Sequence, residues 1–331
     1  MTLCHGASPV RDRASLALAW DWAASPAYRR AMDPDRGTRV LRRAVLATTL
    51  TEPGAVGDLE TREAGLLLEG TADRDALDIP WGELVLAGGD PGGVLPEGVV
   101  RRRVGRWLRL RLSVHERLCM DGIDAGRAWL VSRVRPRALP ADHELHPGPS
   151  WAQRTILGGA LEYGLALRGV DDDGRPDPEA VGLLPSALLL ASGIDVQVAM
   201  ARADRYLTDM AALASDRRRR DPTATLRPLG DADVLTLLAS RSFRTVLVDG
   251  QGMRSAAIPS RTRGWLDLGR LDPAFAVTAA QITDADERGF ARPVLITVDE
   301  VVLVKEGGDA VRQSLADPAP REHTRPASRL A

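Results

Sequence analysis

The most regular alternation of hydrophobic and polar positions lies in residues 101–114, RRRVGRWLRLRLSV. From Leu108 to Val114 every second residue is apolar, and the residues between them are polar. A period of two predicts a half-buried β-strand. We predict a partner strand at 128–135, with the intervening ERLCMDGIDAG closing a long hairpin.

Four further stretches have the apolar character of strands. They are residues 65–70, 83–87, 244–250 and 292–306. In the last of them, apolar residues occupy both phases of the alternation. This pattern indicates either a strand covered on both faces or a strand with a bulge at Asp299–Glu300.

The part of the chain between these strands is predicted to be helical. Residues 151–168 are rich in small residues, and their glycines suit a helix against which another backbone packs closely. Residues 186–220 predict one long helix, or two with a break near Ser192–Gly193. A short helix is expected at 231–239, and residues 12–32 place apolar side chains on one helical face.

This segregation of strands and helices predicts an α+β fold. Antiparallel-rich sheet regions at about 60–136 and 243–306 would flank a helical middle segment at about 151–240. The expected organisation is an N-terminal helical segment 1–58, a β-rich region 59–136, a linker 137–150, a helical region 151–240, a β-rich region 241–306 and a disordered tail 307–331.

Composition narrows the class of protein. Of the 44 basic residues among 331, all but Lys305 are arginine, which is typical of a GC-rich genome. Schiff-base chemistry and lysine-type phosphate loops could therefore use only Lys305. The two cysteines do not make a disulfide framework, and no apolar run approaches the roughly 18 residues of a membrane span. We expect a soluble, cytoplasmic protein.

Charge is distributed unevenly along the chain. Residues 98–137 contain eleven arginines and three acidic residues, whereas residues 52–97 contain eleven acidic residues and two arginines. If 101–114 and 128–135 are paired strands, arginine and tryptophan interleave on one sheet face, which could bind phosphates by charge and bases by stacking. The residues of this predicted nucleic-acid face are Trp107, Arg109, Arg111, Trp129, Arg133 and Arg135.

An ordinary structural explanation competes with nucleic-acid binding. The acidic and basic segments could be neighbours in one sheet, where opposite charges pair across strands. Arginine stems also cover apolar surface. Both explanations stay open from the sequence.

Other polar motifs are assigned to ordinary structure. Arg217–Arg220 suit the C-terminal end of a helix, where the helix dipole is negative. DGQGMRS, residues 249–255, partly matches a dinucleotide fingerprint but lacks a following helical pattern, so a tight hairpin turn is predicted. The glycine-rich residues 87–98 lack the lysine of a phosphate loop and predict a mobile surface loop. DDDGRPDPE, residues 171–179, lacks calcium-loop spacing and predicts a solvated loop.

The search for catalytic and metal-binding residues finds little. Cys4, His5, His115 and Cys119 could form a zinc site only if distant segments met, and His143 and His146 lie in a predicted loop. No nucleophile elbow is present. We therefore expect no catalytic constellation, no metal and no cofactor.

The sequence therefore predicts a soluble, non-enzymatic binding or assembly subunit that contacts nucleic acid through the arginine-rich face. Its expected partners are nucleic acid or another protein subunit, and no membrane. Two alternatives stay open. One is an enzyme with a dispersed site, for which His115, Cys119 and Asp299–Glu300 are candidates. The other is a self-assembling structural protein.

Overall fold

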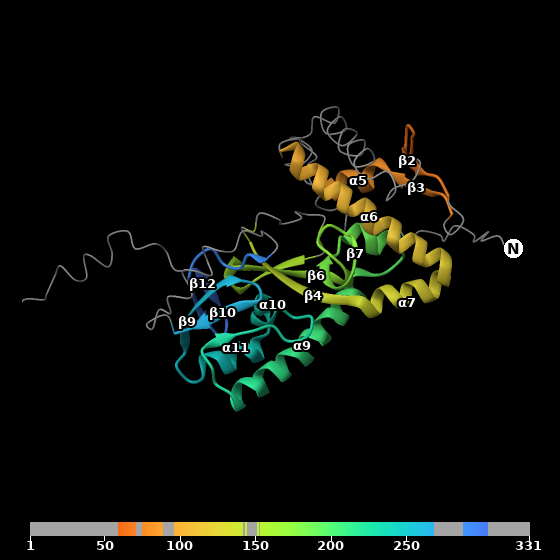
Figure 1. Ribbon diagram of the computed structural model, residues 1–331. Coiled ribbons are helices and arrows are strands. Elements are labelled where there is room, and N and C mark those ends of the chain that lie inside the picture. The colour runs from red at the N-terminus through yellow and green to blue at the C-terminus, as the bar shows by residue number, and fades with distance from the viewer. Residues whose placement is uncertain are drawn as a thin grey trace, which may run out of the picture.

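The computed structural model describes residues 59–70, 75–88, 96–141, 143, 151, 153–267 and 287–303 (Figure 1). The predicted N-terminal helical segment 1–58, the predicted tail 307–331 and most of the glycine-rich residues 87–98 lie outside the described residues. No described helix is both long enough and apolar enough to cross a lipid bilayer.

The predicted α+β class is confirmed, because antiparallel sheets and helices occupy separate stretches of the described chain. The helices are α5 (Trp81–Gly88), α6 (Glu97–Asp121), α7 (Ile123–Arg133), α8 (Ser186–Ala191), α9 (Val196–Arg220), α10 (Val234–Ala239) and α11 (Arg241–Val248), with a 3₁₀ turn η2 (Leu157–Gly159).

The described strands form three antiparallel sheets. The N-terminal sheet has the order β1-β2-β3, the central sheet is built around β6, and the C-terminal sheet has the order β12-β11-β9-β10-β8. The strands are β1 (Leu59–Thr61), β2 (Gly65–Leu68), β3 (Leu77–Pro80), β4 (Val134–Pro140), β5 (Gln153–Ile156), β6 (Leu161–Val170), β7 (Pro176–Leu183), β8 (Thr225–Leu226), β9 (Met253–Ser260), β10 (Arg263–Leu266), β11 (Val294–Thr297) and β12 (Val301–Leu303).

The predicted strand at 101–114 is wrong, because these residues lie within the helix α6. The helix runs between the elements of the N-terminal sheet and those of the central sheet (Figure 1). The hydrophobic core on each side receives side chains spaced four residues apart. The two rows are offset by two positions, so together they imitate the period of a strand. They are Val104, Leu108 and Leu112 toward the N-terminal sheet, and Leu110, Val114 and Leu118 toward the central sheet.

Its predicted partner strand and the hairpin between them are also wrong. Residues 123–133 form α7, which follows α6 after a corner at Gly122, and only from Val134 does the chain become the strand β4. Residues 83–87, also predicted as a strand, belong to α5. Residues 137–140 of the predicted linker complete β4.

The helix predicted at 151–168 is replaced by strands. β5 and most of β6 occupy this stretch, joined by the η2 turn. Gly158 and Gly159 have φ angles of +68° and +91°, in the left-handed region that glycine adopts without strain. The small residues therefore serve a tight turn and a buried central strand, where a helix had been expected.

The helices predicted at 186–220 and 231–239 are confirmed. α8 and α9 are separated at Ser192–Gly193, as the sequence indicates, and α10 begins after Asp233, whose carboxylate accepts a hydrogen bond from the Thr236 N–H at 2.7 Å. The predicted strand at 244–250 is wrong, because residues 241–248 form α11. The following DGQGMRS forms a tight turn, but it leads from α11 into β9 and is not a hairpin between strands.

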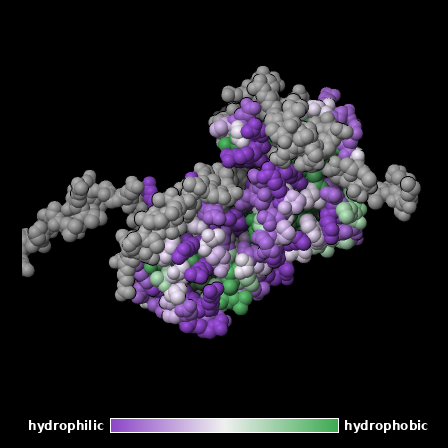
Figure 2. Space-filling model, in the orientation of Figure 1, coloured by the Kyte–Doolittle hydropathy of each residue, from purple (hydrophilic) through white to green (hydrophobic). Residues whose placement is uncertain are grey.

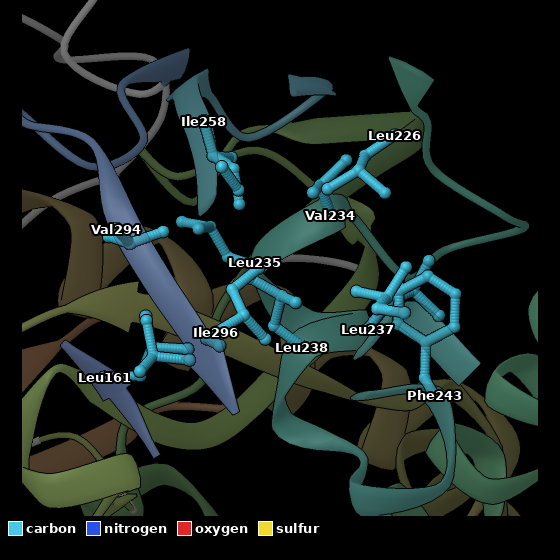
Figure 3. Packing of buried hydrophobic residues seen from close by; sticks show 14 of the residues in the cluster. Leu161, Leu226, Val234, Leu235, Leu237, Leu238, Phe243, Ile258, Val294 and Ile296 are labelled. Carbon is cyan, nitrogen blue, oxygen red and sulfur yellow. The ribbon is translucent and has the colours of Figure 1, made fainter. Parts of the chain in front are cut away.

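Within the predicted strand 292–306, residues 294–303 form a hairpin of β11 and β12 with Asp299–Glu300 in the turn, so the prediction of one bulged or doubly covered strand is wrong. Residues 304–306 lie outside the described residues. The largest core lies between this sheet and the central sheet. Figure 3 shows Leu235 and Leu238 of α10 pointing among Ile258, Val294 and Ile296, with Leu161 of the central sheet nearby.

A buried arginine ties several of these elements together. Arg137 of β4 donates from Nη2 to Asp172 at 3.0 Å and from Nη1 to the Val181 carbonyl at 2.8 Å, and its Nε lies 3.8 Å from Asp233 Oδ2. The prediction of a solvated loop at 171–179 is therefore wrong for Asp172, and it is also wrong for residues 176–179, which belong to the strand β7. Gly174 packs against α6, where an added Cβ would lie 2.7 Å from the Arg106 carbonyl oxygen.

The charge of Asp172 is stabilised by its surroundings. Burial favours the neutral carboxyl, but the charges of Arg137 and Arg106, and hydrogen bonds from Arg137 and the Leu183 N–H, outweigh it and hold the pKa of Asp172 below its ordinary value. An acid whose pKa is lowered by folding stabilises the folded state above its unfolded pKa. This stabilisation is lost as pH falls through the lowered folded pKa.

We predict that Asp172→Asn lowers the free energy of unfolding at neutral pH by about 3 kcal/mol, because Arg137 loses its buried partner charge. The difference from the wild type should begin to shrink below about pH 4, where the carboxyl of the unfolded chain becomes protonated, and should disappear as pH falls through the lowered folded pKa. Urea unfolding at neutral and acidic pH measures both effects. Asp173→Asn, in the same loop but exposed, is the matched control and should change stability by less than about 0.5 kcal/mol. Equal losses of unfolding free energy in the two variants would contradict a stabilising role for the buried ion pair between Asp172 and Arg137.

Candidate anion-binding site

The predicted nucleic-acid face does not form as a sheet, because residues 97–133 are helical. Trp107 is 1% exposed and packs in the core between α6 and the N-terminal sheet, so it offers no surface for stacking. Arg111 is 8% exposed and its Nε lies 3.9 Å from Glu83 Oε2. Burial, partly opposed by the Glu83 charge, lowers the pKa of Arg111.

The competing prediction, that the acidic and basic segments are neighbours in one sheet, is also wrong. The two segments are nevertheless in contact through Arg111 and Glu83.

The other members of the predicted face have internal partners. Arg109 donates to the Asp173 carbonyl at 2.6 Å, and Arg135 donates to Asp231 Oδ2 at 2.6 Å. Arg133 lies over the ring of Trp129, 5.0 Å from its centroid. These arginines hold the fold together, and nucleic-acid contact through them stays a prediction.

A different group of arginines surrounds a pocket of about 230 Å³ at the C-terminal end of α9. The pocket lies between the last turns of this helix, the segment that follows it and α11. The end of α9 is at the lower edge of the molecule in Figure 1, and hydrophilic residues cover that edge in Figure 2. The lining residues are Ala214, Arg217, Arg218, Asp221, Thr223, Thr225, Leu226, Arg227, Pro228, Leu229 and Phe243.

The shape of the pocket follows from how α9 ends. As the sequence predicts, Arg217–Arg220 occupy the last turn of the helix. The Asp221 N–H donates to the Arg217 carbonyl at 2.9 Å, and Pro222 cannot continue the helical hydrogen bonding. Arg218 donates to the Thr223 carbonyl and so holds the following segment against the helix end.

The pocket is electropositive. Arg217 and Arg227 are exposed, and neither forms an ion pair with an acidic residue in the part of the chain that the structure describes. Arg218 is half-buried, and burial together with the charge of Arg254 lowers its pKa, although Asp267 and Asp249 oppose this. Asp221 is the acidic residue in the lining. The lining therefore contains three arginines and one aspartate, and the Arg218 guanidinium already donates to the Thr223 carbonyl.

Strand pairing adds a fourth arginine beside the pocket. β8 and β10 pair with Trp265 opposite Thr225 and Gly264 opposite Leu226. Arg263 and Arg227 lie one residue beyond the last of these pairs, at the same end of the ladder. Both side chains add positive charge to that end.

The sequence identified Arg217–Arg220 but explained them by the helix dipole, and it missed Arg227 and Arg263. No local pattern connects these two residues, which are 36 positions apart. They come together through the two-residue strand β8, which is too short to leave a periodic signal. The cue that was available is a cluster of arginines before a helix-ending proline, followed by another arginine within one short loop.

The residues considered for an enzyme are not gathered into one site. His115 and Cys119 lie one turn apart on α6, with 3.8 Å between Nε2 and Sγ, whereas Asp299 and Glu300 lie in the β11–β12 turn. Asp299 pairs with Arg241 at 3.0 Å. His143 is buried, and Cys4, His5 and His146 lie outside the described residues. The described residues contain no group of three or more side chains placed to hold a metal ion.

Comparison with known proteins identifies no relative: no protein-family model, no curated protein and no solved structure matches this chain. The pocket at the end of α9 is therefore assigned from its own geometry and charge.

We predict that Arg227→Ala changes the free energy of unfolding by no more than about 0.5 kcal/mol, because Arg227 is exposed and forms no ion pair with an acidic residue in the described chain. Urea unfolding measures this. The contrasting variant is Arg254→Ala, because Arg254 makes two hydrogen bonds to Asp267 at 2.7 and 2.6 Å. Its loss should cost about 1–3 kcal/mol. A comparable loss for Arg227→Ala would show that Arg227 has a structural role.

Proposed function

We propose that this protein is a non-enzymatic binding subunit that captures a phosphate group of a polyanionic partner in the pocket at the end of α9. The observation that carries the proposal is that Arg217 and Arg227 line a pocket without acidic partners among the described residues. Nucleic acid is the polyanion expected from the sequence. The proposed contact, however, moves from α6 to the end of α9.

The chemistry of the lining supports an anionic ligand. A guanidinium group presents several N–H donors in a planar fork that matches two oxygens of a phosphate. The hydroxyl of Thr225 adds a neutral donor, whereas the Thr223 hydroxyl donates to the Thr225 carbonyl at 3.3 Å. The C-terminal end of a helix carries a partial negative charge, which the arginines of the last turn of α9 offset.

Other arginines of the fold show what a structural role looks like. Arg135, Arg137 and Arg254 each donate to an aspartate at 3.0 Å or less. A buried or half-buried guanidinium needs such a partner, since an unpaired charge is costly to remove from water. Arg217 and Arg227 depart from this pattern because both are exposed beside a concavity.

The size of the pocket indicates which part of a ligand it holds. At about 230 Å³ it is smaller than the roughly 300–1,000 Å³ of pockets that enclose drug-sized molecules. It suits one unit of a longer chain better than a whole cofactor. A polyanion would place one phosphate and its neighbouring atoms in the pocket and continue over the exposed arginines around it.

We predict that the double variant Arg217→Ala/Arg227→Ala binds long-chain inorganic polyphosphate at least about tenfold more weakly than the wild type at low salt, because two charge-assisted contacts are lost. The dependence of affinity on salt should also become shallower, since fewer counterions are released on binding. Isothermal titration calorimetry at several salt concentrations measures both.

The matched control for charge is Arg202→Ala/Arg292→Ala, which removes two exposed arginines located on the first half of α9 and before β11. It should retain nearly wild-type affinity. Equal weakening in both double variants would indicate diffuse attraction to the whole surface and would contradict a site at the end of α9.

A further inference from the structure

We infer that the pocket at the end of α9 accepts an unpaired nucleotide, so that the partner is single-stranded nucleic acid rather than a duplex or a simple polyphosphate. The inference rests on the proposed function, because it names the ligand of the same pocket. Two observations beyond the arginines carry it: the apolar part of the pocket, and a stacked guanidinium beside it.

The lining of the pocket includes apolar residues as well as polar ones. Five of its residues carry no charged or hydroxyl group, three of them largely buried, and an oxyanion gains nothing from contact with such apolar atoms. A nucleobase has apolar faces and polar edges, so it can pack against such a wall while its phosphate reaches the arginines. The apolar lining residues are Ala214, Leu226, Pro228, Leu229 and Phe243.

A stacking platform lies beside the pocket on the β8–β10 ladder. The guanidinium of Arg263 lies over the Trp265 ring, 5.0 Å from the centroid, and Trp265 is opposite Thr225 of the pocket lining. A planar guanidinium that rests on an indole can offer its outer face to a second flat group. Bases of single strands stack on both aromatic rings and arginine planes.

These features disfavour a duplex. In a duplex the bases are stacked inside and the phosphates lie outside, so only the arginines at the rim would make contact. Using the apolar wall would require a base to leave the stack, which carries an unstacking cost that a single strand avoids. A ligand that contacts both the apolar lining residues and the arginines of the pocket is therefore a flexible single strand.

The test is fluorescence anisotropy with the full chain and three labelled probes of equal length: oligothymidylate, an abasic strand with the same number of phosphates, and the duplex of oligothymidylate with oligoadenylate. We expect oligothymidylate to bind about tenfold more tightly than either of the others, the ratio expected for one well-stacked base. Arg263→Ala should reduce the preference for oligothymidylate over the abasic strand to about threefold or less. Because these two probes carry the same number of phosphates, the loss of one positive charge by itself would weaken both alike and leave their ratio unchanged.

The outcomes separate this inference from the proposed function. Equal binding of all three probes, weakened alike by Arg217→Ala/Arg227→Ala, would overturn the single-strand inference and leave a phosphate-binding site in place. If the wild type binds neither polyphosphate nor the oligonucleotides, both the proposed function and the single-strand inference are overturned. An Arg292→Ala variant that reduced the preference as much as Arg263→Ala would also overturn the stacking role of Arg263.

Discussion

The ion pair between Arg137 and Asp172 is the contact on which the arrangement of the central region depends. It connects β4 to the loop between β6 and β7, and the same guanidinium reaches the β7 backbone and the carboxylate that caps α10. Because this loop and β7 are held in place, Arg109 can donate to the Asp173 carbonyl of the loop and Arg106 to the Leu183 carbonyl at the end of β7, and α6 is fixed against the central sheet. One buried charge thus determines where a helix, two strands and a loop meet.

Arginine performs two physically distinct tasks in this molecule, and burial separates them. Where the side chain is buried, desolvation makes a partner necessary, and the fold supplies aspartates or backbone carbonyls. Where it lies exposed beside a pocket, as at Arg217 and Arg227, water can solvate the charge until an anion replaces the water. The same residue type therefore builds the scaffold and forms the proposed binding site.

The two uses also explain why net charge along the sequence is a poor guide to the site here. The segment 98–137 is strongly basic, yet its predicted nucleic-acid residues are buried or bound to internal partners. The residues that the structure gathers around a pocket come instead from 214–229, 243 and the β8–β10 ladder. The local net charge shows how many arginines the fold must pair or expose. Only the tertiary surroundings of each arginine show which of them face solvent without an acidic partner.

The sequence by itself determined the features that depend on local physics: the α+β class, the strand at 65–68, the break between α8 and α9, the short helix α10 and the arginine-rich end of α9. Tertiary structure decided the rest. The alternation in 101–114 became a helix because two cores cover that helix at once, and the small residues of 151–168 became a turn and a strand because β6 is central to a sheet. The pairing of β8 with β10, which brings the segments that carry Arg227 and Arg263 together, was likewise beyond any sequence window. The hydrophobic period and the charge of a segment indicate which of its residues need apolar or charged neighbours. The identity of those neighbours is fixed only when distant segments pack together.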